Sequence, residues 1–286
     1  MLGYFDYLTR CDLTKWSRGP LEADSAAAVM SSLENVLEVE NLAKAFGGVQ
    51  AVNGVSLHVA PGERLALIGP NGAGKTTLFN CINGQLQPDA GRVRVLGADV
   101  TGSVPHRIWH RSVGRTFQIA ATFMSMTVRE NVQLALASSA GSTTSLGRRL
   151  GKQFRDEADT LVAMVGLGAR ADETAMELPY GDLKRLELAM AMANAPSLLL
   201  MDEPTAGMET NARSGMMDLV DAMVAERGVA VLFTEHDMDV VFGHADRVIV
   251  LDRGGLIADG NPDEIRADAN VRAVYLGTFE VDGRAS

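Results

Sequence analysis

The chain has 286 residues, a formal net charge of −10 and 47% hydrophobic residues. This length suits one large domain with a subdomain, and the hydrophobic fraction excludes a disordered chain. The acidic balance argues against a nucleic-acid partner, because nucleic-acid-binding surfaces are usually basic. Two cysteines, Cys11 and Cys81, are too few for a disulfide framework or a metal cluster.

The start of the chain predicts neither a secretory signal nor a membrane span. Residues 1–16 lack a basic start followed by an apolar run. The longest apolar stretches in the chain are far shorter than the ~20 residues that cross a bilayer. We therefore expect a cytoplasmic protein in which residues 1–33 form a disordered N-terminal extension. Two alternatives are open: a small docking element that contains Tyr4, Phe5, Tyr7 and Trp16, and a translation start at Met30.

Alternating strands and helices are predicted from residue 34 onward. In the first part, apolar patterns indicate strands at Val36–Val39, Val55–Val59, Arg64–Ile68 and Arg92–Leu96, with a helix at Lys75–Gly84. After Pro196 the alternation returns, with strands at Ser197–Met201, Val229–Phe233 and Arg247–Leu251 and helices near Asn211–Glu226 and Asp237–Gly243. Such alternation predicts a mostly parallel sheet that is covered on both faces.

The middle of the chain, residues 120–195, is predicted to be a mainly helical insertion. Thr127 is followed three residues later by Glu130, which is the spacing of a capping box at a helix start. Ser138–Ser145 is rich in serine, glycine and threonine and predicts a loop. The residues that follow Pro262 are expected to form a short helical tail over 263–286.

The strongest local pattern is GPNGAGKTT, which directly follows the strand Arg64–Ile68 and opens a helix. It matches the phosphate-loop pattern G-x-x-x-x-G-K-[ST] in the context that this pattern requires. Its residues are Gly69, Pro70, Asn71, Gly72, Ala73, Gly74, Lys75, Thr76 and Thr77. The loop amides and Lys75 are expected to hold ATP phosphates, and the Thr76 hydroxyl is expected to ligate Mg²⁺.

A second pattern, LLLMDEP, is an apolar strand that ends in two adjacent carboxylates, Asp202 and Glu203. Asp202 is suited to binding Mg²⁺ through water. Glu203 is suited to act as the base that orients and deprotonates the attacking water. Paired acids can also cap a helix, but together with a phosphate loop they predict phosphoryl transfer to water.

The combined pattern resembles the ATPase subunit of ABC transporters from about Val36 to Asp259. The resemblance implies a P-loop NTPase (RecA-like) α/β core over residues 34–262, with an antiparallel β subdomain and an inserted helical subdomain. It also assigns further site residues. Phe46 matches an aromatic that stacks on adenine, and Gln118 matches a glutamine that senses Mg²⁺ and the γ-phosphate and faces the membrane partner. His236 matches a switch histidine on the γ-phosphate, and the stretch Ala206–Glu209 matches a loop that crosses the dimer interface.

One segment departs from the family pattern. The signature sequence, usually LSGGQ, stands here as LPYGD, with the residues Leu178, Pro179, Tyr180, Gly181 and Asp182. Pro179 replaces a serine hydroxyl but suits a helix start. Asp182 adds negative charge at that start, which favours the helix more than a bound phosphate.

Several stretches resemble the branched-chain amino acid importer group, among them GRTFQ, MTVRENV, FTEHDMDVVF and VYLG. This resemblance implies a second ATPase subunit, identical or different, two transmembrane permeases and, indirectly, a periplasmic binding protein. It places the chain on the cytoplasmic face of the inner membrane. Urea, short amides and lipopolysaccharide export stay open as other cargoes. Two other classes are a soluble ABC protein of translation or DNA repair and a regulatory module that binds ATP without turnover.

Overall fold

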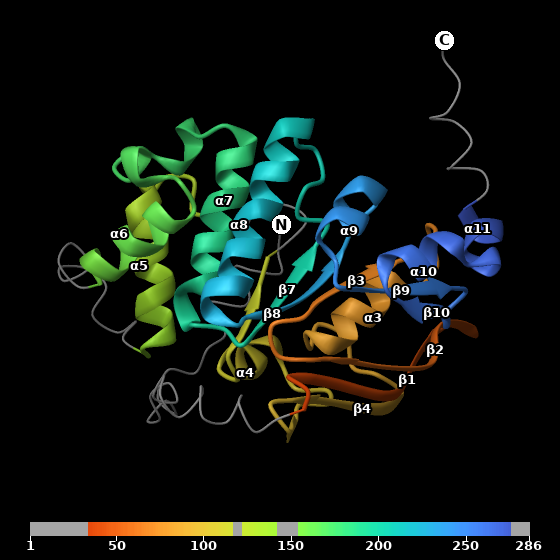
Figure 1. The fold of residues 1–286 in the computed structure, drawn as a ribbon. Coiled ribbons are helices and arrows are strands. Elements are labelled where there is room, and N and C mark those ends of the chain that lie inside the picture. The colour runs from red at the N-terminus through yellow and green to blue at the C-terminus, as the bar shows by residue number, and fades with distance from the viewer. Residues whose placement is uncertain (1–33, 117–121, 142–153, 276–286) are drawn as a thin grey trace, which may run out of the picture.

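The computed structural model describes residues 34–116, 122–141 and 154–275, whose strands form two sheets (Figure 1). The four-stranded sheet has the order β2-β1-β4-β5 and contains β1 (Leu37–Phe46), β2 (Val49–Val59), β4 (Ala90–Val95) and β5 (Ala98–Asp99). The six-stranded sheet has the order β10-β9-β3-β8-β7-β6 and contains β3 (Arg64–Ile68), β6 (Val113–Arg115), β7 (Leu198–Asp202), β8 (Ala230–Thr234), β9 (Arg247–Asp252) and β10 (Gly255–Gly260). The first sheet is antiparallel, and the second is parallel except at β10.

The helices cover both faces of the six-stranded sheet. They are α3 (Lys75–Ile82), α4 (Pro105–Trp109), α5 (Val128–Ser139), α6 (Arg155–Met164), α7 (Tyr180–Ala191), α8 (Thr210–Arg227), α9 (Met238–His244), α10 (Pro262–Ala267) and α11 (Ala269–Tyr275). Figure 1 shows α3 between the two sheets, with α8 and α9 on the opposite side of the parallel strands. Every helix in the described ranges is too short or too polar to span a bilayer.

Side chains at alternate positions of the parallel strands pack into two separate cores. In β3, Leu65 and Leu67 join a core shared with α3 and the antiparallel sheet, while Ala66 and Ile68 face the core of α5 to α11. Successive strand residues point to opposite faces, so a strand covered on both sides must be apolar at every position. This explains why Arg64–Ile68 is predicted with its full bounds from the sequence.

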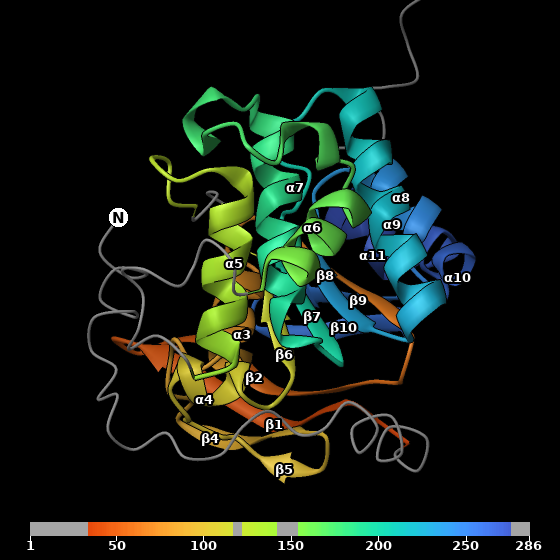
Figure 2. The same cartoon turned by 90° about the vertical axis from the view of Figure 1, so that its left-hand side faces the viewer.

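The predicted α/β class, with an antiparallel sheet and a helical part, is confirmed. The capping box is also present, since Thr127 Oγ1 accepts from the Glu130 amide at 3.2 Å and Glu130 accepts from the Thr127 amide at 2.9 Å. It starts α5, which packs with α6 and α7 at one end of the molecule (Figures 1 and 2). The expected N-terminal extension lies outside the described residues.

The C-terminal residues follow the expected helical pattern through α10 and α11. Asn261 caps α10 by accepting from the Asp263 and Glu264 amides at 3.0 and 2.9 Å. Ile265 and Val271 are buried in the larger core. These helices are therefore packed onto the α/β unit, and residues 276–286 lie outside the described part.

Candidate functional site

The phosphate loop connects β3 to α3 and is shaped by two close backbone approaches. Gly69 has φ +155°, and a Cβ there would lie 2.2 Å from the Leu251 carbonyl oxygen of β9. Gly74, the N-cap of α3, has φ +103°, and a Cβ there would lie 2.0 Å from the Ala51 carbonyl oxygen of β2. Only glycine fits at these positions, so the loop is held between strands of both sheets.

Lys75 is the first residue of α3, and its side chain folds back across the loop. Its Nζ donates to the Gly69 carbonyl at 2.5 Å and to the Pro70 carbonyl at 3.1 Å. Burial lowers the pKa of Lys75, and the charges of Glu203 and Asp202 raise it in part. The ammonium group is thus brought near both predicted carboxylates, in a loop whose amides lie at a helix N-terminus.

The two carboxylates stand at the carboxyl end of β7, paired in register with the end of β8. Thr234 Oγ1 donates to Asp202 Oδ1 at 2.8 Å and accepts from the Glu203 amide at 3.0 Å. Glu203 adopts φ +49°, a conformation uncommon for a residue with a Cβ. Thr234 is 1% exposed and holds both the Asp202 carboxylate and the Glu203 backbone, a contact that the sequence did not predict.

The predicted histidine is brought into contact with the predicted base. His236 Nε2 lies 2.7 Å from Glu203 Oε1, and the His236 side chain is 50% exposed. Glu203 is 20% exposed on the same measure. The strand ends of β7 and β8 therefore place an acid–histidine pair at an open edge, where water and a phosphate can approach.

The oxygen donors beside the loop suit Mg²⁺. Asp202 offers a carboxylate, with one oxygen already held by Thr234. Thr76 offers a hydroxyl and follows Lys75 in the first turn of α3. Carboxylate and hydroxyl oxygens, together with phosphate oxygens, are the ligands that Mg²⁺ prefers. Gln118, the third predicted ligand, lies outside the described residues.

Phe46 ends β1 at a tight turn and is 47% exposed. It pairs with Val49 at the start of β2, and the Lys44 ammonium lies 5.6 Å from its ring centroid. Val49 is two residues from Ala51, a separation of about 7 Å along a strand. The Ala51 carbonyl contacts the phosphate loop. An exposed aromatic ring is therefore available near the loop for stacking.

The signature segment forms the start of α7. Pro179 is the N-cap residue and its carbonyl accepts from the Asp182 and Leu183 amides, each at 3.0 Å. Asp182 lies 3.4 Å from Arg170 and 4.0 Å from Arg185, so two guanidinium groups balance its charge. Tyr180 is 42% exposed, whereas Leu178 is buried.

The same segment packs against the turn after β7. A Cβ on Gly207 would lie 3.3 Å from the Tyr180 ring, and a Cβ on Gly181 would lie 3.5 Å from the Met208 methyl. Gly207 and Met208 belong to the stretch Ala206–Glu209, which the resemblance assigns to the dimer interface. The structure therefore brings two predicted interface segments together.

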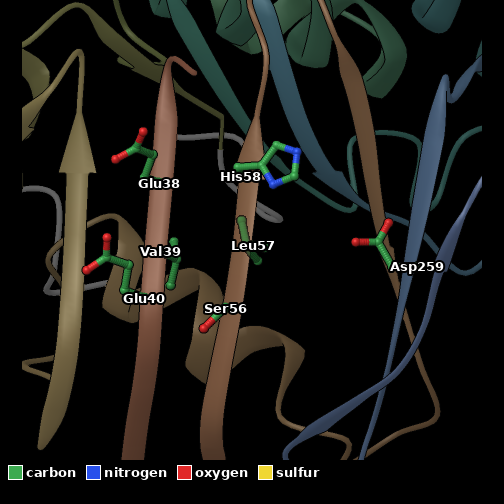
Figure 3. A pocket seen from close by; sticks show the side chains of 7 residues that line it. All are labelled: Glu38, Val39, Glu40, Ser56, Leu57, His58 and Asp259. Atoms are coloured by element: carbon green, nitrogen blue, oxygen red, sulfur yellow. The ribbon is translucent and has the colours of Figure 1, made fainter. Parts of the chain in front are cut away.

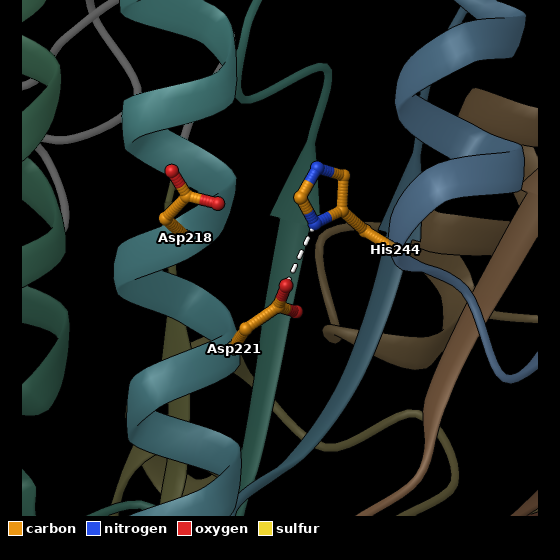
Figure 4. A group of neighbouring side chains, drawn as sticks. All are labelled: Asp218, Asp221 and His244. Atoms are coloured by element: carbon orange, nitrogen blue, oxygen red, sulfur yellow. Dashed lines mark hydrogen bonds and ion pairs between the residues drawn. The ribbon is translucent and has the colours of Figure 1, made fainter.

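Two further groups of polar side chains have structural explanations. The pocket in Figure 3 contains Glu40 of β1 and Asp259 of β10, which pair with Arg94 at 2.6 Å and Arg247 at 2.9 Å. The group in Figure 4 contains Asp218 and Asp221 of α8 and His244 of α9. Both oxygens of Asp221 are in use, since Arg64 Nη1 donates to one at 2.6 Å and His244 Nδ1 lies 2.7 Å from the other.

Comparison with known proteins identifies several relatives. The ABC transporter family model matches residues 52–206, and a model described as branched-chain amino acid ATP-binding cassette transporter matches residues 256–281. The chain is 37% identical to the high-affinity branched-chain amino acid transport ATP-binding protein BraF of Pseudomonas aeruginosa, over 85% of this chain and 98% of that protein. It is 38% identical to the corresponding protein LivG of Escherichia coli K12, with the same coverage.

Solved structures show the same fold. The ADP conformation of MJ1267, an ATP-binding cassette of an ABC transporter, is 31% identical with a TM-score of 0.76, covering 86% of this chain and 100% of that chain. The dimeric, post-hydrolysis state of the ATP-binding cassette MJ0796 bound to ADP and Pi is 26% identical with a TM-score of 0.68, covering 79% and 98%.

A phosphate loop at a helix start, with an acid pair and a histidine at neighbouring strand ends, defines a nucleotide-hydrolysing P-loop protein. Within that class, the chain belongs to the ATP-binding subunits of ABC transporters. It is an ATPase whose hydrolysis is coupled to transport.

Proposed function

We propose that this chain is the ATP-hydrolysing subunit of an importer for branched-chain or related amino acids. The observation that carries the hydrolytic part is the 2.7 Å contact between His236 and Glu203 beside the phosphate loop. The cargo class is supported by the names of BraF and LivG and by the match of residues 256–281 to a branched-chain amino acid transporter model.

In this proposal the loop residues Gly69–Thr77 hold the phosphates of ATP. The loop amides and Lys75 Nζ bind phosphate oxygens, so Lys75 exchanges its bonds to the loop carbonyls for bonds to the nucleotide. Phe46 stacks on adenine. Thr76, Asp202 and Gln118 would hold Mg²⁺, which supplies charge neutralisation on the phosphates when it is bound.

Glu203 acts as the general base for the attacking water. With a proton on Nε2, His236 donates to one oxygen of the Glu203 carboxylate. The second oxygen of Glu203 is then oriented to accept the proton of water as the water attacks the γ-phosphate. When ATP is bound, the Nε2–H of His236 is shared between Glu203 and a γ-phosphate oxygen, and the Thr234 hydroxyl holds the Asp202 carboxylate and the Glu203 backbone.

A second ATPase subunit completes the site in this proposal. Phe46 and His236 are about half exposed, so the nucleotide edge of a single chain is open to a partner. The signature segment Leu178–Asp182 of one chain would meet the nucleotide of the other at the start of α7, where Arg170 and Arg185 balance the Asp182 charge. The MJ0796 cassette, which is related in fold, is described as a dimer with ADP and Pi.

The atypical signature favours a partner with a different sequence. A Glu203→Gln chain should retain ATP without hydrolysing it, and light scattering should then find at most a weak homodimer. A stable, ATP-dependent homodimer would exclude the heteromeric arrangement.

Two permeases and, through them, a periplasmic binding protein complete the importer in this proposal. Binding to the permeases would hold the chain at the cytoplasmic face of the inner membrane.

Uptake of radiolabelled leucine in the source cells tests the function. A chromosomal Lys75→Ala variant should abolish leucine uptake and leave an unrelated sugar unaffected, because phosphate binding is lost. Arg227→Ala, at the exposed end of α8, is the control and should transport normally. Unchanged leucine uptake in Lys75→Ala would reject the cargo and make urea, amides and lipopolysaccharide the next candidates.

A further inference from the structure

Thr234, the last residue of β8, and the two residues that follow it each contact the end of β7 or the segment after β7. Thr234 bonds to Asp202 and the Glu203 amide, and His236 bonds to the Glu203 side chain. The residue between them, Glu235, has no part in the proposed mechanism. Its side chain turns away from solvent and is 3% exposed, which is unusual for a carboxylate.

Both oxygens of Glu235 accept hydrogen bonds. Oε1 accepts from the Thr205 amide at 2.8 Å and from the Thr205 hydroxyl at 2.6 Å. Oε2 accepts from the His236 amide at 3.1 Å. Hydrogen bonds to an ionised acceptor are about twice as strong as neutral ones, and water has little access here to replace them.

Thr205 occupies the turn that joins the catalytic edge to α8. Its carbonyl accepts from the Met208 amide at 3.1 Å, and the Glu203 carbonyl accepts from the Ala206 amide at 3.2 Å. The turn continues to Gly207, which packs against the Tyr180 ring. Packing and backbone hydrogen bonds within this turn therefore connect Tyr180 with Thr205.

We propose that Glu235 is a positioning residue for ATP hydrolysis, whose carboxylate joins the turn 204–209 to the backbone of His236. The inference rests on the proposed roles of Glu203 and His236. Glu203 lies directly before the turn, and His236 lies directly after Glu235. By holding Thr205 and the His236 amide together, Glu235 fixes the backbone beside Glu203 and beside His236. The positions of these two backbone segments determine the geometry of the Glu203–His236 pair. Movement of the turn at the subunit interface then changes the geometry of that pair.

The chemistry of the site requires a carboxylate and not merely a polar side chain. Glutamine has the same shape, but it has one acceptor oxygen where glutamate has two. In Glu235→Gln, an NH₂ group faces either the Thr205 donors or the His236 amide, which is itself a donor. One of the two backbone amides, that of Thr205 or that of His236, therefore loses its acceptor, whereas the packing volume is unchanged.

Steady-state hydrolysis of MgATP by the full-length chain tests the proposal. We expect Glu235→Gln to lower kcat by roughly 10- to 100-fold and to change the KM for MgATP by less than about threefold, because geometry and not binding is altered. Thr205→Val, which removes the hydroxyl donor, should act in the same direction. Thr205→Ser keeps that hydroxyl, so its kcat should lie within about threefold of the wild-type value.

Amide hydrogen exchange gives a second readout that does not depend on turnover. In Glu235→Gln the Thr205 or the His236 amide should exchange about tenfold faster, since one of them loses its acceptor. Glu63→Gln is the matched control. Glu63 is also mostly buried and accepts from the Ala60 amide, but it precedes β3, at the opposite end of the parallel strands. Glu63→Gln should leave both amides and kcat unchanged.

The outcomes separate this inference from the proposed function. A normal kcat in Glu203→Gln would overturn the assignment of the general base itself. An inactive Glu203→Gln with a normal kcat in Glu235→Gln would overturn only the positioning role. A parallel loss of kcat, nucleotide binding and thermal stability in Glu235→Gln and Thr205→Val would show a role in folding alone and would also overturn it.

Discussion

Replacing Gly74 with alanine should destabilise the chain through one steric clash. The added Cβ would lie 2.0 Å from the Ala51 carbonyl oxygen, which belongs to strand β2 and cannot move freely. Overpacking of this kind costs about 1–3 kcal/mol. The φ of +103° costs an L-residue about 1–2 kcal/mol more. Gly72→Ala is the matched control, because Gly72 has φ +82° in the same loop but no atom within 4 Å of its added Cβ.

The difference between the two variants isolates the clash. Gly72→Ala carries only the backbone cost, so Gly74→Ala should be less stable by about 1–3 kcal/mol. At about 2–4 °C per kcal/mol, its melting temperature should be roughly 2–12 °C lower in the absence of nucleotide. Calorimetry of both variants without ATP measures this directly. Equal melting temperatures would refute the claim that contact with β2 makes glycine necessary at the end of the loop.

Two further predictions concern stability and reactivity. Thr127→Ala should lower the free energy of unfolding by about 0.5–2 kcal/mol, because α5 loses its capping box, and Thr127→Ser should retain most of it in the same denaturant titration. Burial raises the pKa of the Cys81 thiol to about 11. The contribution of the buried, protonated thiol to the free energy of unfolding is therefore complete below pH 9, and it is lost as the pH rises towards 11. At pH 8 only about 0.1% of this thiol is ionised, so the Cys81 peptide should resist iodoacetamide until the chain is unfolded; rapid native labelling would contradict this.

Much of the parallel sheet could be predicted because burial on both faces makes a strand continuously apolar. Arg64–Ile68 and Arg247–Leu251 are examples, and the latter is extended by one residue in β9. The three-residue strand β6 was missed because it contains Gly114 and the charged Arg115, and its apolar signal is too short. β10 was missed because it is half exposed, so its side chains carry no clear period.

The residues of the site that belong to a local sequence motif could be predicted. The residues whose contacts depend on which strands lie side by side could not. The loop with Lys75 and the acid pair follow from local sequence patterns. Thr234 and Glu235 are found only when β8 is placed beside β7, because Asp202 pairs with Thr234 across the sheet. That register cannot be seen in the sequence alone, because parallel strands are joined by long connections that do not show which residues face each other. Gln118 stays a prediction, as do the roles assigned to the site residues.

The supports of the phosphate loop come from both ends of the domain, and this affects when the loop can take its shape. Gly254 donates to the Ala73 carbonyl at 2.9 Å and its carbonyl accepts from Asn53 at 2.8 Å, while Leu251 packs on Gly69. A ribosome produces the loop about 180 residues before it produces these C-terminal contacts. A nascent chain or a fragment that stops before Leu251 therefore contains the complete motif without the strand that shapes it. We therefore expect ATP binding only from chains that extend past Gly254.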